Sequence, residues 1–183
     1  MPTKCAILVI DMLNDFIKGS LKSERFRRII PYIKELLRVA HEKKIPVIYV
    51  NDSHLEEIDL EFKIWPPHAV KGTWGAEVIE ELAPQKGDYI IEKRRYSGFY
   101  NTDLDDMLRE LKVDTLILTG ICTDICVQHT AADAFYRGYK IIIPMECVES
   151  LSEKDHKKGI ETMKRLYNAK VMPLKQVLSI ITK

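Results

Sequence analysis

The stretch Cys5-Ala-Ile-Leu-Val-Ile10, followed at once by Asp11, decides the fold of this chain. Six consecutive apolar residues that end at an acidic residue are typical of a strand buried on both faces of a parallel sheet. Beyond this strand, short β-rich runs alternate with stretches of helical periodicity along the chain. This alternation predicts an α/β fold of three layers (α/β/α), with a mostly parallel sheet of about six strands between helices.

The hydrophobic periodicity, the helix-capping residues and the helix-breaking residues indicate where the strands and helices of this Rossmann-like arrangement lie. Strands are expected at residues 5–10, 46–50, 89–91, 115–119, 140–143 and 170–172. Helices are expected at residues 26–43, 76–82 and 154–167. A further helix is expected to begin after a cap at Thr102 or Asp103 and to end at about Leu111. Another is expected to begin after a cap at Thr123 or Asp124 and to end at Gly138. An irregular segment of about residues 51–75 follows the second strand, and loops of that length are often functional.

Length and composition exclude several classes of protein. The 183 residues suit a single domain spanning residues 1–183, and 46% hydrophobic residues can bury a core. The net charge of +1 supplies no general attraction for nucleic acid or an anionic membrane. No apolar run approaches the roughly 20 residues of a membrane span or forms the core of a signal peptide. We therefore expect a cytoplasmic protein whose four cysteines are reduced thiols, one of them used for chemistry.

Chemically active side chains follow four of the predicted strands. In parallel sheets of this kind, ligands bind outside the carboxyl ends of the strands. Asp11 follows the first strand, Asp52 and His54 follow the second, Lys93 follows the third, and residues 120–126 follow the fourth. If these strands are neighbours, a carboxylate, a candidate metal site, an ammonium and a thiol meet at one rim of the sheet.

Cys126 lies at the expected start of a helix, where unpaired N–H groups and the helix dipole lower the pKa of a thiol and favour a nucleophile. The alternative is a small buried core residue, which is the commoner use of a free cysteine. The apolar stripe of this helix begins at Val127, whereas Cys126 shares a face with His129 and Asp133. This pattern weighs against the core alternative without excluding it.

Asp11 and Lys93 gain meaning only together with Cys126. Alone, Asp11 could cap the turn after its strand, and Lys93 belongs to a charged run that could be solvated surface. Jointly they supply the base and the positive charge that acyl transfer to a thiol requires. Cys122 and Cys126 have a Cys-x3-Cys spacing, which is not that of a zinc knuckle. The other two cysteines are expected to be buried in or beside strands.

A second group of polar residues follows the second strand. Asp52 and His54 alternate at the strand end, so both side chains can point the same way, and Glu61 and His68 follow in the same loop. Two imidazoles with one or two carboxylates suit Zn²⁺, Fe²⁺ or Mn²⁺. The alternative is a polar loop in which ligand types are merely scattered. The remaining histidines lack such neighbours and are expected to be surface or capping residues: His41, His129 and His156.

Four blocks in register give the sequence a family resemblance. They are Asp11-Met-Leu-Asn-Asp-Phe16, Asn51-Asp-Ser-His54 with Trp65-Pro-Pro-His68, Glu92-Lys-Arg-Arg-Tyr-Ser-Gly-Phe99 and Thr119-Gly-Ile-Cys-Thr-Asp-Ile-Cys-Val127. With these blocks the chain resembles the nicotinamidases of the isochorismatase-like cysteine hydrolase superfamily nearly end to end. Two positions depart from the common pattern of the family: Leu13, where many relatives have Gln, and Asn101, where many have Gly. Both departures concern the shape of the pocket.

The resemblance assigns a role to each candidate residue. It implies a catalytic triad of Asp11, Lys93 and Cys126. It implies an oxyanion site made by the backbone N–H groups of Cys122 and Cys126, after a cis peptide bond between Ile121 and Cys122. It implies aromatic residues around the substrate ring at Phe16, Trp65 and Tyr96. It implies metal ligands at Asp52, His54 and His68, with Glu61 as a fourth.

The implied reaction is hydrolysis of nicotinamide to nicotinate and ammonia in NAD salvage, through a thioester on Cys126. One divalent metal is implied, with zinc as the first choice and iron or manganese as alternatives, and it holds the pyridine nitrogen. Pyrazinamide is an implied second substrate and homo-oligomers are common in the family; no nucleic-acid or membrane partner is expected. Two alternatives stay open: a sibling cysteine hydrolase of another amide or ureido compound, and a catalytically silent docking domain. A nucleotide-binding α/β protein is disfavoured because the chain lacks both glycine-rich phosphate motifs.

Overall fold

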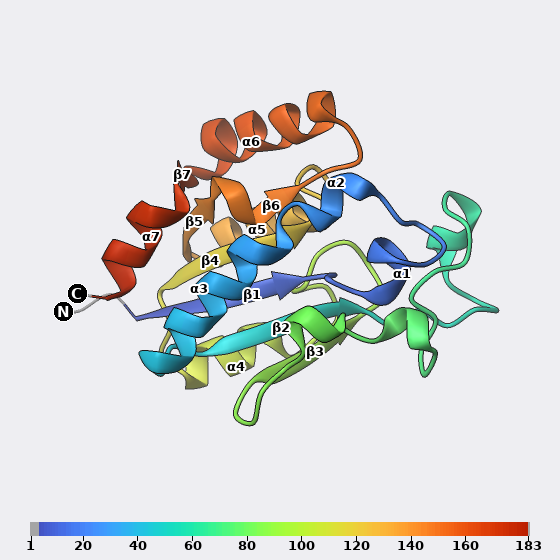
Figure 1. Cartoon of the computed structure of the whole chain (residues 1–183), viewed down its shortest axis with the longest axis horizontal. Coiled ribbons are helices and arrows are strands. Elements are labelled where there is room, and N and C mark those ends of the chain that lie inside the picture. Colours follow the sequence, from blue (N-terminus) through green and yellow to red (C-terminus); the bar gives the residue numbers. More distant parts are fainter. Residues whose placement is uncertain (1–3, 183) are drawn as a thin grey trace.

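The computed structural model describes residues 4–182. A sheet of seven parallel strands lies at its centre in the order β3-β2-β1-β4-β5-β7, with β6 paired to β4 (Figure 1). The strands are β1 (Cys5–Ile10), β2 (Val47–Asp52), β3 (Tyr89–Lys93), β4 (Thr115–Ile121), β5 (Lys140–Pro144), β6 (Val148–Glu149) and β7 (Lys170–Met172). The helices are α1 (Asn14–Ile17), α2 (Glu24–Arg27), α3 (Ile30–Glu42), α4 (Leu104–Glu110), α5 (Cys126–Tyr136), α6 (Glu153–Tyr167) and α7 (Leu174–Ile181).

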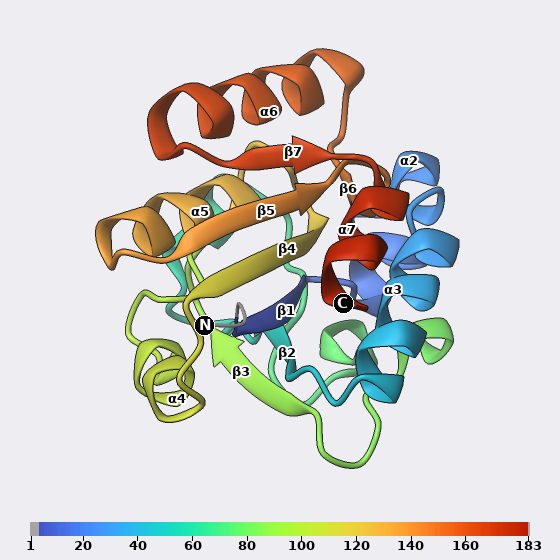
Figure 2. The ribbon, with the colours of Figure 1, turned by 90° about the vertical axis from the view of Figure 1, so that its left-hand side faces the viewer.

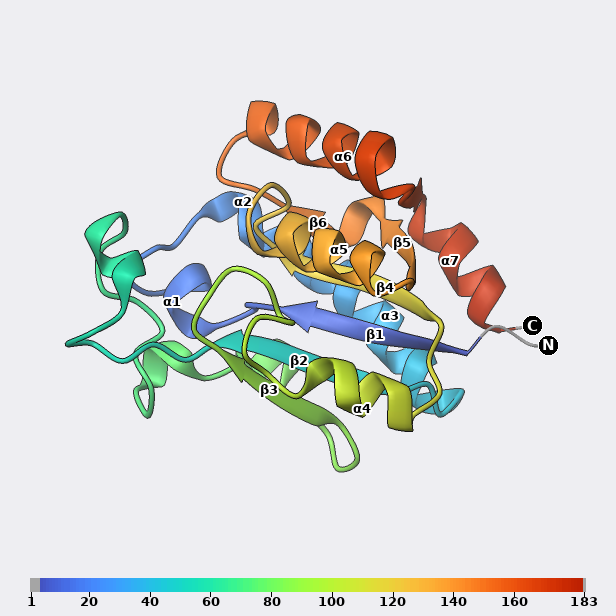
Figure 3. The same ribbon diagram turned by 180° about the vertical axis from the view of Figure 1, so that it is seen from behind.

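Helices cover both faces of the sheet. α2, α3 and α7 lie on one face, and α4 and α5 lie on the other, with α6 packed outside α5 (Figures 2 and 3). β1 shows why its sequence is continuously apolar: Ile7 and Val9 point into the core under α3, while Ala6, Leu8 and Ile10 point into the core under α5. The predicted three-layer α/β fold with a mostly parallel sheet is confirmed.

β1 and β4 are neighbouring strands at the centre of the sheet. After β1 the chain continues on the face covered by α3, and after β4 it continues on the face covered by α5. In parallel sheets, ligands bind at the carboxyl ends of two neighbouring strands whose connections run to opposite faces in this way. Gly120 lets β4 approach β1 closely at this point, since its φ is 102° and an added Cβ would lie 2.0 Å from the carbonyl oxygen of Ile10. Only glycine accommodates both constraints.

Two predicted helices differ from the structure. The expected helix at 26–43 is divided into α2 and α3, because Pro31 lacks an N–H group and is accommodated in the first turn of a new helix. The expected helix at 76–82 is wrong, since its middle pairs with the chain after β1: Ile79 N donates to Met12 O at 3.1 Å. Only short 3-10 turns remain there, at Trp74–Ala76 and Glu80–Leu82.

Three elements of the structure are not among the expected ones. β6 has two residues and α1 has four, so neither is long enough to show a period. α7 is not expected either, although Leu174, Val177, Leu178 and Ile181 have the spacing of an amphipathic helix. β6 raises the number of strands from the expected six to seven. Within residues 4–182 no helix has both the length and the apolar character that crossing a bilayer requires.

Candidate active site

Four polar side chains reach the carboxyl end of the sheet from neighbouring strands, beside the long segment between β2 and β3 (drawn teal to green in Figure 1). Asp11 directly follows β1, Asp52 ends β2, Lys93 ends β3, and Cys126 begins α5 after β4. Asp52 and Lys93 are register partners in adjacent strands, so the sheet itself sets them side by side. The strand order therefore brings the predicted carboxylate, ammonium and thiol to one rim.

Lys93 is the buried centre of this group, with 1% of its surface exposed. Its Nζ lies 2.9 Å from Asp11 Oδ2, 2.5 Å from Asp52 Oδ1 and 3.6 Å from Cys126 Sγ. Burial alone would lower the pKa of Lys93, but the charges of Asp11 and Asp52 together raise it well above its usual range. The raised pKa favours the charged form of Lys93 beside the thiol. Because Lys93 is buried, the alternative of a solvated surface lysine is wrong.

Asp11 has one carboxylate oxygen fixed and one available. Its backbone is left-handed, with φ of 54°, and Oδ1 accepts a hydrogen bond of 2.7 Å from the N–H of Asp52. Oδ2 is buried without a hydrogen-bond partner, although it lies near the Lys93 ammonium. Burial, together with the charge of Asp52, raises the pKa of Asp11 to about 6 against the opposing effect of Lys93. Oδ2 is thus placed to accept a proton.

Cys126 is the first residue of α5, as expected, but its pKa differs from the prediction. Burial, together with the charges of Asp11 and Asp52, raises the pKa of this thiol well above its usual range, and the nearby Lys93 only opposes the effect. Its sulfur and a carboxylate oxygen of each aspartate all lie within 4.8 Å of one another. Cys126 is therefore a thiol in this state, and it becomes a nucleophile only if a neighbour takes its proton.

Two backbone N–H groups, those of Cys122 before α5 and of Cys126 at its first residue, concern the predicted oxyanion site. The peptide bond between Ile121 and Cys122 is cis, as predicted. Among the hydrogen bonds of residues 4–182, neither the backbone N–H of Cys122 nor that of Cys126 has an acceptor.

The predicted caps of α5 are wrong: the N-cap is Ile125, and no side chain caps the helix. Instead, Thr123 and Asp124 bond outward, to His156 and Ser150 respectively.

The four predicted metal ligands converge in one buried cluster. Asp52, His54, Glu61 and His68 each offer one ligand atom, and these atoms lie within 4.8 Å of one another. Nε2 of His54 is 3.6 Å from Asp52 and 3.7 Å from Glu61, and Nε2 of His68 is 4.0 Å from Asp52. His54 Nε2 and Glu61 Oε1 are buried without a hydrogen-bond partner. Buried acceptors that face one another in this way fit a cation between them.

Asp59 orients the cluster and has no signal of its own in the sequence pattern. Its Oδ2 lies 3.1 Å from Nδ1 of His54 and also accepts from the N–H of Leu55 at 2.8 Å. Burial opposes ionisation, but bonds from Arg94 and the Leu55 N–H hold the pKa of Asp59 well below its usual range. The carboxylate therefore takes a hydrogen from Nδ1 of His54, which leaves Nε2 as an acceptor for a metal.

His68 is oriented in the same sense by the backbone. Its Nδ1 lies 2.8 Å from the carbonyl oxygen of Pro66, which can only accept, so Nδ1 carries the hydrogen and Nε2 is free.

The other histidines lie outside the cluster. His129 is exposed, as expected, whereas His41 is partly buried and bonds Asp88.

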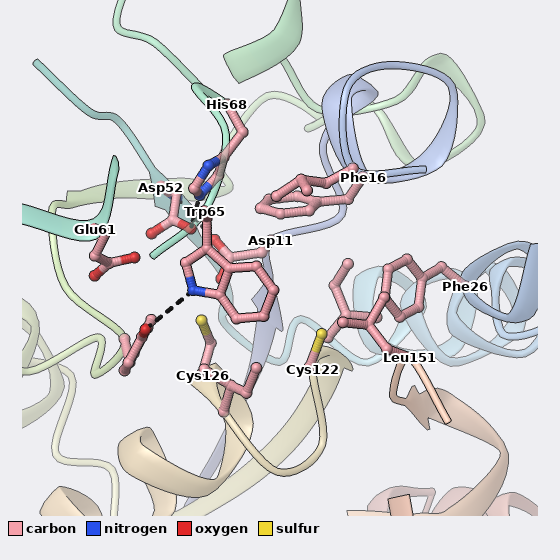
Figure 4. A pocket seen from close by; sticks show the side chains of 14 residues that line it. Asp11, Phe16, Phe26, Asp52, Glu61, Trp65, His68, Cys122, Cys126 and Leu151 are labelled. Carbon is pink, nitrogen blue, oxygen red and sulfur yellow. Dashed lines mark hydrogen bonds and ion pairs between the residues drawn. The ribbon is translucent and has the colours of Figure 1, made fainter. Parts of the chain in front are cut away.

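A mostly apolar cavity connects the metal-ligand cluster with the thiol (Figure 4). The three predicted aromatic residues, Phe16, Trp65 and Tyr96, all line it. Phe16 packs its ring edge-on against His68, and the indole N–H of Trp65 donates to the hydroxyl of Tyr96 at 3.1 Å. The cavity thus offers flat aromatic walls between the cluster of Asp52, His54, Glu61 and His68 and the Cys126 thiol.

Comparisons with known proteins agree with this geometry. The nicotinamidase PncA from Bacillus subtilis superposes with a TM-score of 0.88 at 36% identity, covering 92% of this chain and 99% of its own. N-carbamoylsarcosine amidase from Thermoplasma acidophilum superposes with 0.88 at 40% identity, covering 94% and 97%. The pyrazinamidase of Pyrococcus horikoshii, solved in complex with zinc, superposes with 0.85 at 30% identity, covering 93% and 99%.

The family model of the isochorismatase domain matches residues 5–176, which includes every strand of the sheet and all the side chains gathered at its rim. The chain therefore belongs to the isochorismatase family of hydrolases.

Proposed function

We propose that this protein is a nicotinamidase, which hydrolyses nicotinamide to nicotinate and ammonia through a thioester on Cys126. The observation that carries the proposal is the placement of the four-residue ligand cluster and the thiol around one aromatic cavity. A thiol, a carboxylate and an ammonium suffice for hydrolysis of any amide. A metal-ligand cluster facing the same cavity is useful for a substrate that carries its own metal-binding atom, such as a pyridine nitrogen.

The charge of the cavity favours a neutral substrate over a ureido acid. Its lining includes the carboxyl groups of Asp11, Asp52 and Glu61 and the imidazole of His68, and among residues 4–182 no Lys or Arg lines it. A divalent ion in the cluster would be balanced by Asp52 and Glu61. A substrate carboxylate, such as that of N-carbamoylsarcosine, would lose its hydration without gaining a cationic side chain. This observation disfavours the sibling hydrolase of a ureido compound.

The residues of the triad support one sequence of proton movements. Asp11 Oδ2 takes the proton of the Cys126 thiol, and Lys93 stabilises the thiolate. The thiolate attacks the amide carbon while the N–H groups of Cys122 and Cys126 donate to the oxyanion, a contribution worth about 10²–10³ in rate for each donor. Asp11 then gives its proton to the departing ammonia and accepts one from the water that hydrolyses the thioester.

The walls of the cavity would hold the ring while this occurs. Phe16 and Trp65 present aromatic surfaces, and the bond from Trp65 to Tyr96 fixes the plane of the indole. Asp52, His54, Glu61 and His68 would hold the metal, which when bound supplies a Lewis-acid contact for the pyridine nitrogen. Two nitrogen and two oxygen donors suit zinc first, with iron or manganese as alternatives. The P. horikoshii pyrazinamidase complex with zinc supports this choice.

A catalytically silent docking domain is the weaker candidate. Two carboxylates and an ammonium buried beneath a thiol are costly to desolvate, and hydrophobic residues would stabilise a purely structural core better. As a nicotinamidase, the protein would serve NAD salvage in the cytoplasm, with pyrazinamide as a second substrate and a homo-oligomer as its expected state.

The experiment that tests the proposal is incubation of zinc-loaded protein with nicotinamide and, separately, with N-carbamoylsarcosine, followed by assays of ammonia and the acid product. We expect equal amounts of ammonia and nicotinate from nicotinamide and no ammonia from N-carbamoylsarcosine. Ammonia from N-carbamoylsarcosine with none from nicotinamide would establish the sibling function instead.

Replacing His54 by alanine is expected to remove the metal and weaken substrate binding. The purified variant should bind well below about one ion per chain, and KM for nicotinamide should rise at least about tenfold. Metal analysis and steady-state kinetics measure both effects. His41→Ala, in α3, is the matched control and should retain the ion. A metal-free His54 variant with unchanged kinetics would refute the role of the cluster in holding the ring.

The rate should fall on the acid side of neutrality. Asp11 must be ionised to take the thiol proton, and its pKa is raised to about 6, so protonation below that pH removes the acceptor. A plot of kcat/KM against pH should show an acid limb near 6, which reports the Asp11–Cys126 pair rather than one residue. A profile that stays flat between about pH 4 and 8 would contradict the role of this pair.

A further inference from the structure

The turn between β4 and α5 carries the proposed oxyanion donors. We call residues 122–125 the oxyanion turn, since the N–H groups of Cys122 and Cys126 lie at its first residue and directly after its last (Figure 4). Within the turn, the carbonyl oxygen of Cys122 accepts from the N–H of Ile125 at 3.0 Å and from that of Val127 at 3.1 Å. These bonds set the shape of the turn, but they do not fix its position relative to the sheet.

β6 holds one side of the oxyanion turn. Glu149 in β6 is the register partner of Ile121, the residue before the turn. The N–H of Thr123 donates to the carbonyl oxygen of Glu149 at 2.9 Å, and the Asp124 carboxylate accepts from the hydroxyl of Ser150. Thr123 and Ser150 are both buried. This side of the turn is therefore tied to the edge of the sheet.

α6 holds the other side of the oxyanion turn and touches its backbone. A bond of 2.9 Å joins Nδ1 of His156 and Oγ1 of Thr123. One turn of helix later, a Cβ added to Gly159 would lie 2.9 Å from both Cα and N of Asp124, and 3.0 Å from the carbonyl carbon of Thr123. All three atoms belong to the backbone, so no side chain can turn aside to make room. The helix reaches the turn only because Gly159 has no side chain.

The helix itself does not require this glycine. Gly159 has a helical backbone rather than a left-handed one, and alanine is a better helix former at such a position. α6 is anchored on both sides of the contact. Ser152 caps its first turn by accepting from the N–H of Asp155 at 3.1 Å, and Met163 is buried in the core that α6 shares with α5. A side chain at position 159 would therefore displace the oxyanion turn and not the helix alone.

We propose that α6 positions the oxyanion turn, with Gly159 and His156 as positioning residues for the hydrolysis. Neither residue lines the cavity, so both act through the turn, by fixing where the N–H groups of Cys122 and Cys126 meet the oxygen of the tetrahedral intermediate. This inference rests on the proposed thioester chemistry and deepens it, because any amide attacked by Cys126 needs the same donors. The alternative is that α6 only covers α5 and the sheet, in which case changes at these residues alter stability alone.

Gly159→Ala is the first test, with zinc-loaded protein and nicotinamide. We expect kcat to fall about tenfold or more, since a misplacement of about 1 Å in a catalytic site costs about 10²-fold in rate. KM and metal content should stay those of the wild type, because the metal-ligand cluster belongs to β2 and the loop after it. Lys158→Ala is the matched control: it changes the exposed neighbour in the same helix and should leave kcat unchanged.

Two inhibitors distinguish positioning of the donors from a general loss of structure. Pyridine-3-carbaldehyde accepts the Cys126 sulfur at its carbonyl carbon: a C–S bond forms, the C=O bond becomes a single bond, and the thiol proton passes to the oxygen. The oxygen of this adduct meets the same two N–H groups, whereas 3-methylpyridine has the ring and no oxygen. Gly159→Ala should raise Ki for the aldehyde about tenfold and leave Ki for 3-methylpyridine unchanged.

A pair of variants at His156 tests the second contact without adding a side chain to the interface. His156→Ala removes the bond to Thr123 and should lower kcat about fivefold, which corresponds to one hydrogen bond. The side-chain amide of asparagine reaches the position of Nδ1, so His156→Asn should restore kcat to within about twofold of the wild type. Melting curves of both variants show whether stability changes in the same order.

The outcomes separate this inference from the proposed function. Wild-type kcat in Gly159→Ala, or an equal rise of Ki for both inhibitors, would overturn the positioning role and leave the nicotinamidase function standing. If Gly159→Ala does not fold, the His156 pair decides: wild-type kcat in both variants would overturn the role, and loss in His156→Ala with rescue in His156→Asn would support it.

Failure of the proposed function has its own signature. If the wild type hydrolyses N-carbamoylsarcosine and not nicotinamide, the nicotinamidase proposal fails. The variants are then measured with N-carbamoylsarcosine, where the same fall in kcat supports the role of α6 and an unchanged kcat overturns it. If the wild type hydrolyses neither amide, the oxyanion donors have no substrate and both proposals are overturned.

Discussion

Cys126→Ala is expected to lower kcat with nicotinamide by at least about 10⁴-fold, because it removes the protein atom that bonds to the substrate carbon. The side chain is buried at the start of α5 and has few atoms to lose, so the variant should fold. The cluster of Asp52, His54, Glu61 and His68 is untouched, so metal content should remain that of the wild type. A single-turnover assay of nicotinate release measures the loss.

The control for this variant is Cys5→Ala. Cys5 is a half-buried cysteine at the opposite end of the sheet, the first residue of β1, and its removal should leave kcat unchanged. Retention by Cys126→Ala of more than about a tenth of the wild-type rate would remove Cys126 as the nucleophile. Loss of the metal from this variant would instead point to a disturbed fold, which a melting curve would reveal.

Asp11→Asn is expected to have the second largest effect, a loss of about 10³-fold in kcat/KM. Asparagine keeps an oxygen that can accept the hydrogen bond of 2.7 Å from the Asp52 N–H, so the local backbone should persist. An amide cannot accept the proton of Cys126 or return one to ammonia. Because burial raises the pKa of the thiol well above its usual range, no thiolate is available without that acceptor.

The pH dependence distinguishes a chemical role of Asp11 from a structural one. The acid limb near pH 6 expected for the wild type should disappear in Asp11→Asn, because the titrating group is gone. Asp106→Asn in α4, an exposed aspartate, is the control and should retain both the rate and the limb. If Asp11→Asn kept the wild-type acid limb, another residue would have to be the base.

Much of this site follows from the sequence because it depends on strand ends. Each of Asp11, Asp52 and Lys93 stands at or just beyond the last residue of an apolar or β-rich run, and parallel strands bring such residues to one edge. The family resemblance then assigns roles to them. The apolar run of β1 predicts its own burial on both faces, which the two cores confirm.

Other features depend on contacts that no local pattern contains. The helix start alone predicts a lowered pKa for Cys126, but the thiol is buried among carboxylates from β1 and β2, and their combined effect has the opposite sign. Asp59 orients His54 only because Arg94, from a different part of the chain, holds it in place.

The covalent state of Cys126 during turnover tests the proposed chemistry most directly. Zinc-loaded protein is mixed with excess nicotinamide, quenched in acid within the first turnovers, digested and measured by mass spectrometry. We expect a nicotinoyl group as a thioester on the peptide that carries Cys126, absent when nicotinamide is omitted and absent from Cys126→Ala. Formation of nicotinate with the acyl group on another residue, or with no acyl-enzyme at any quench time, would contradict the account.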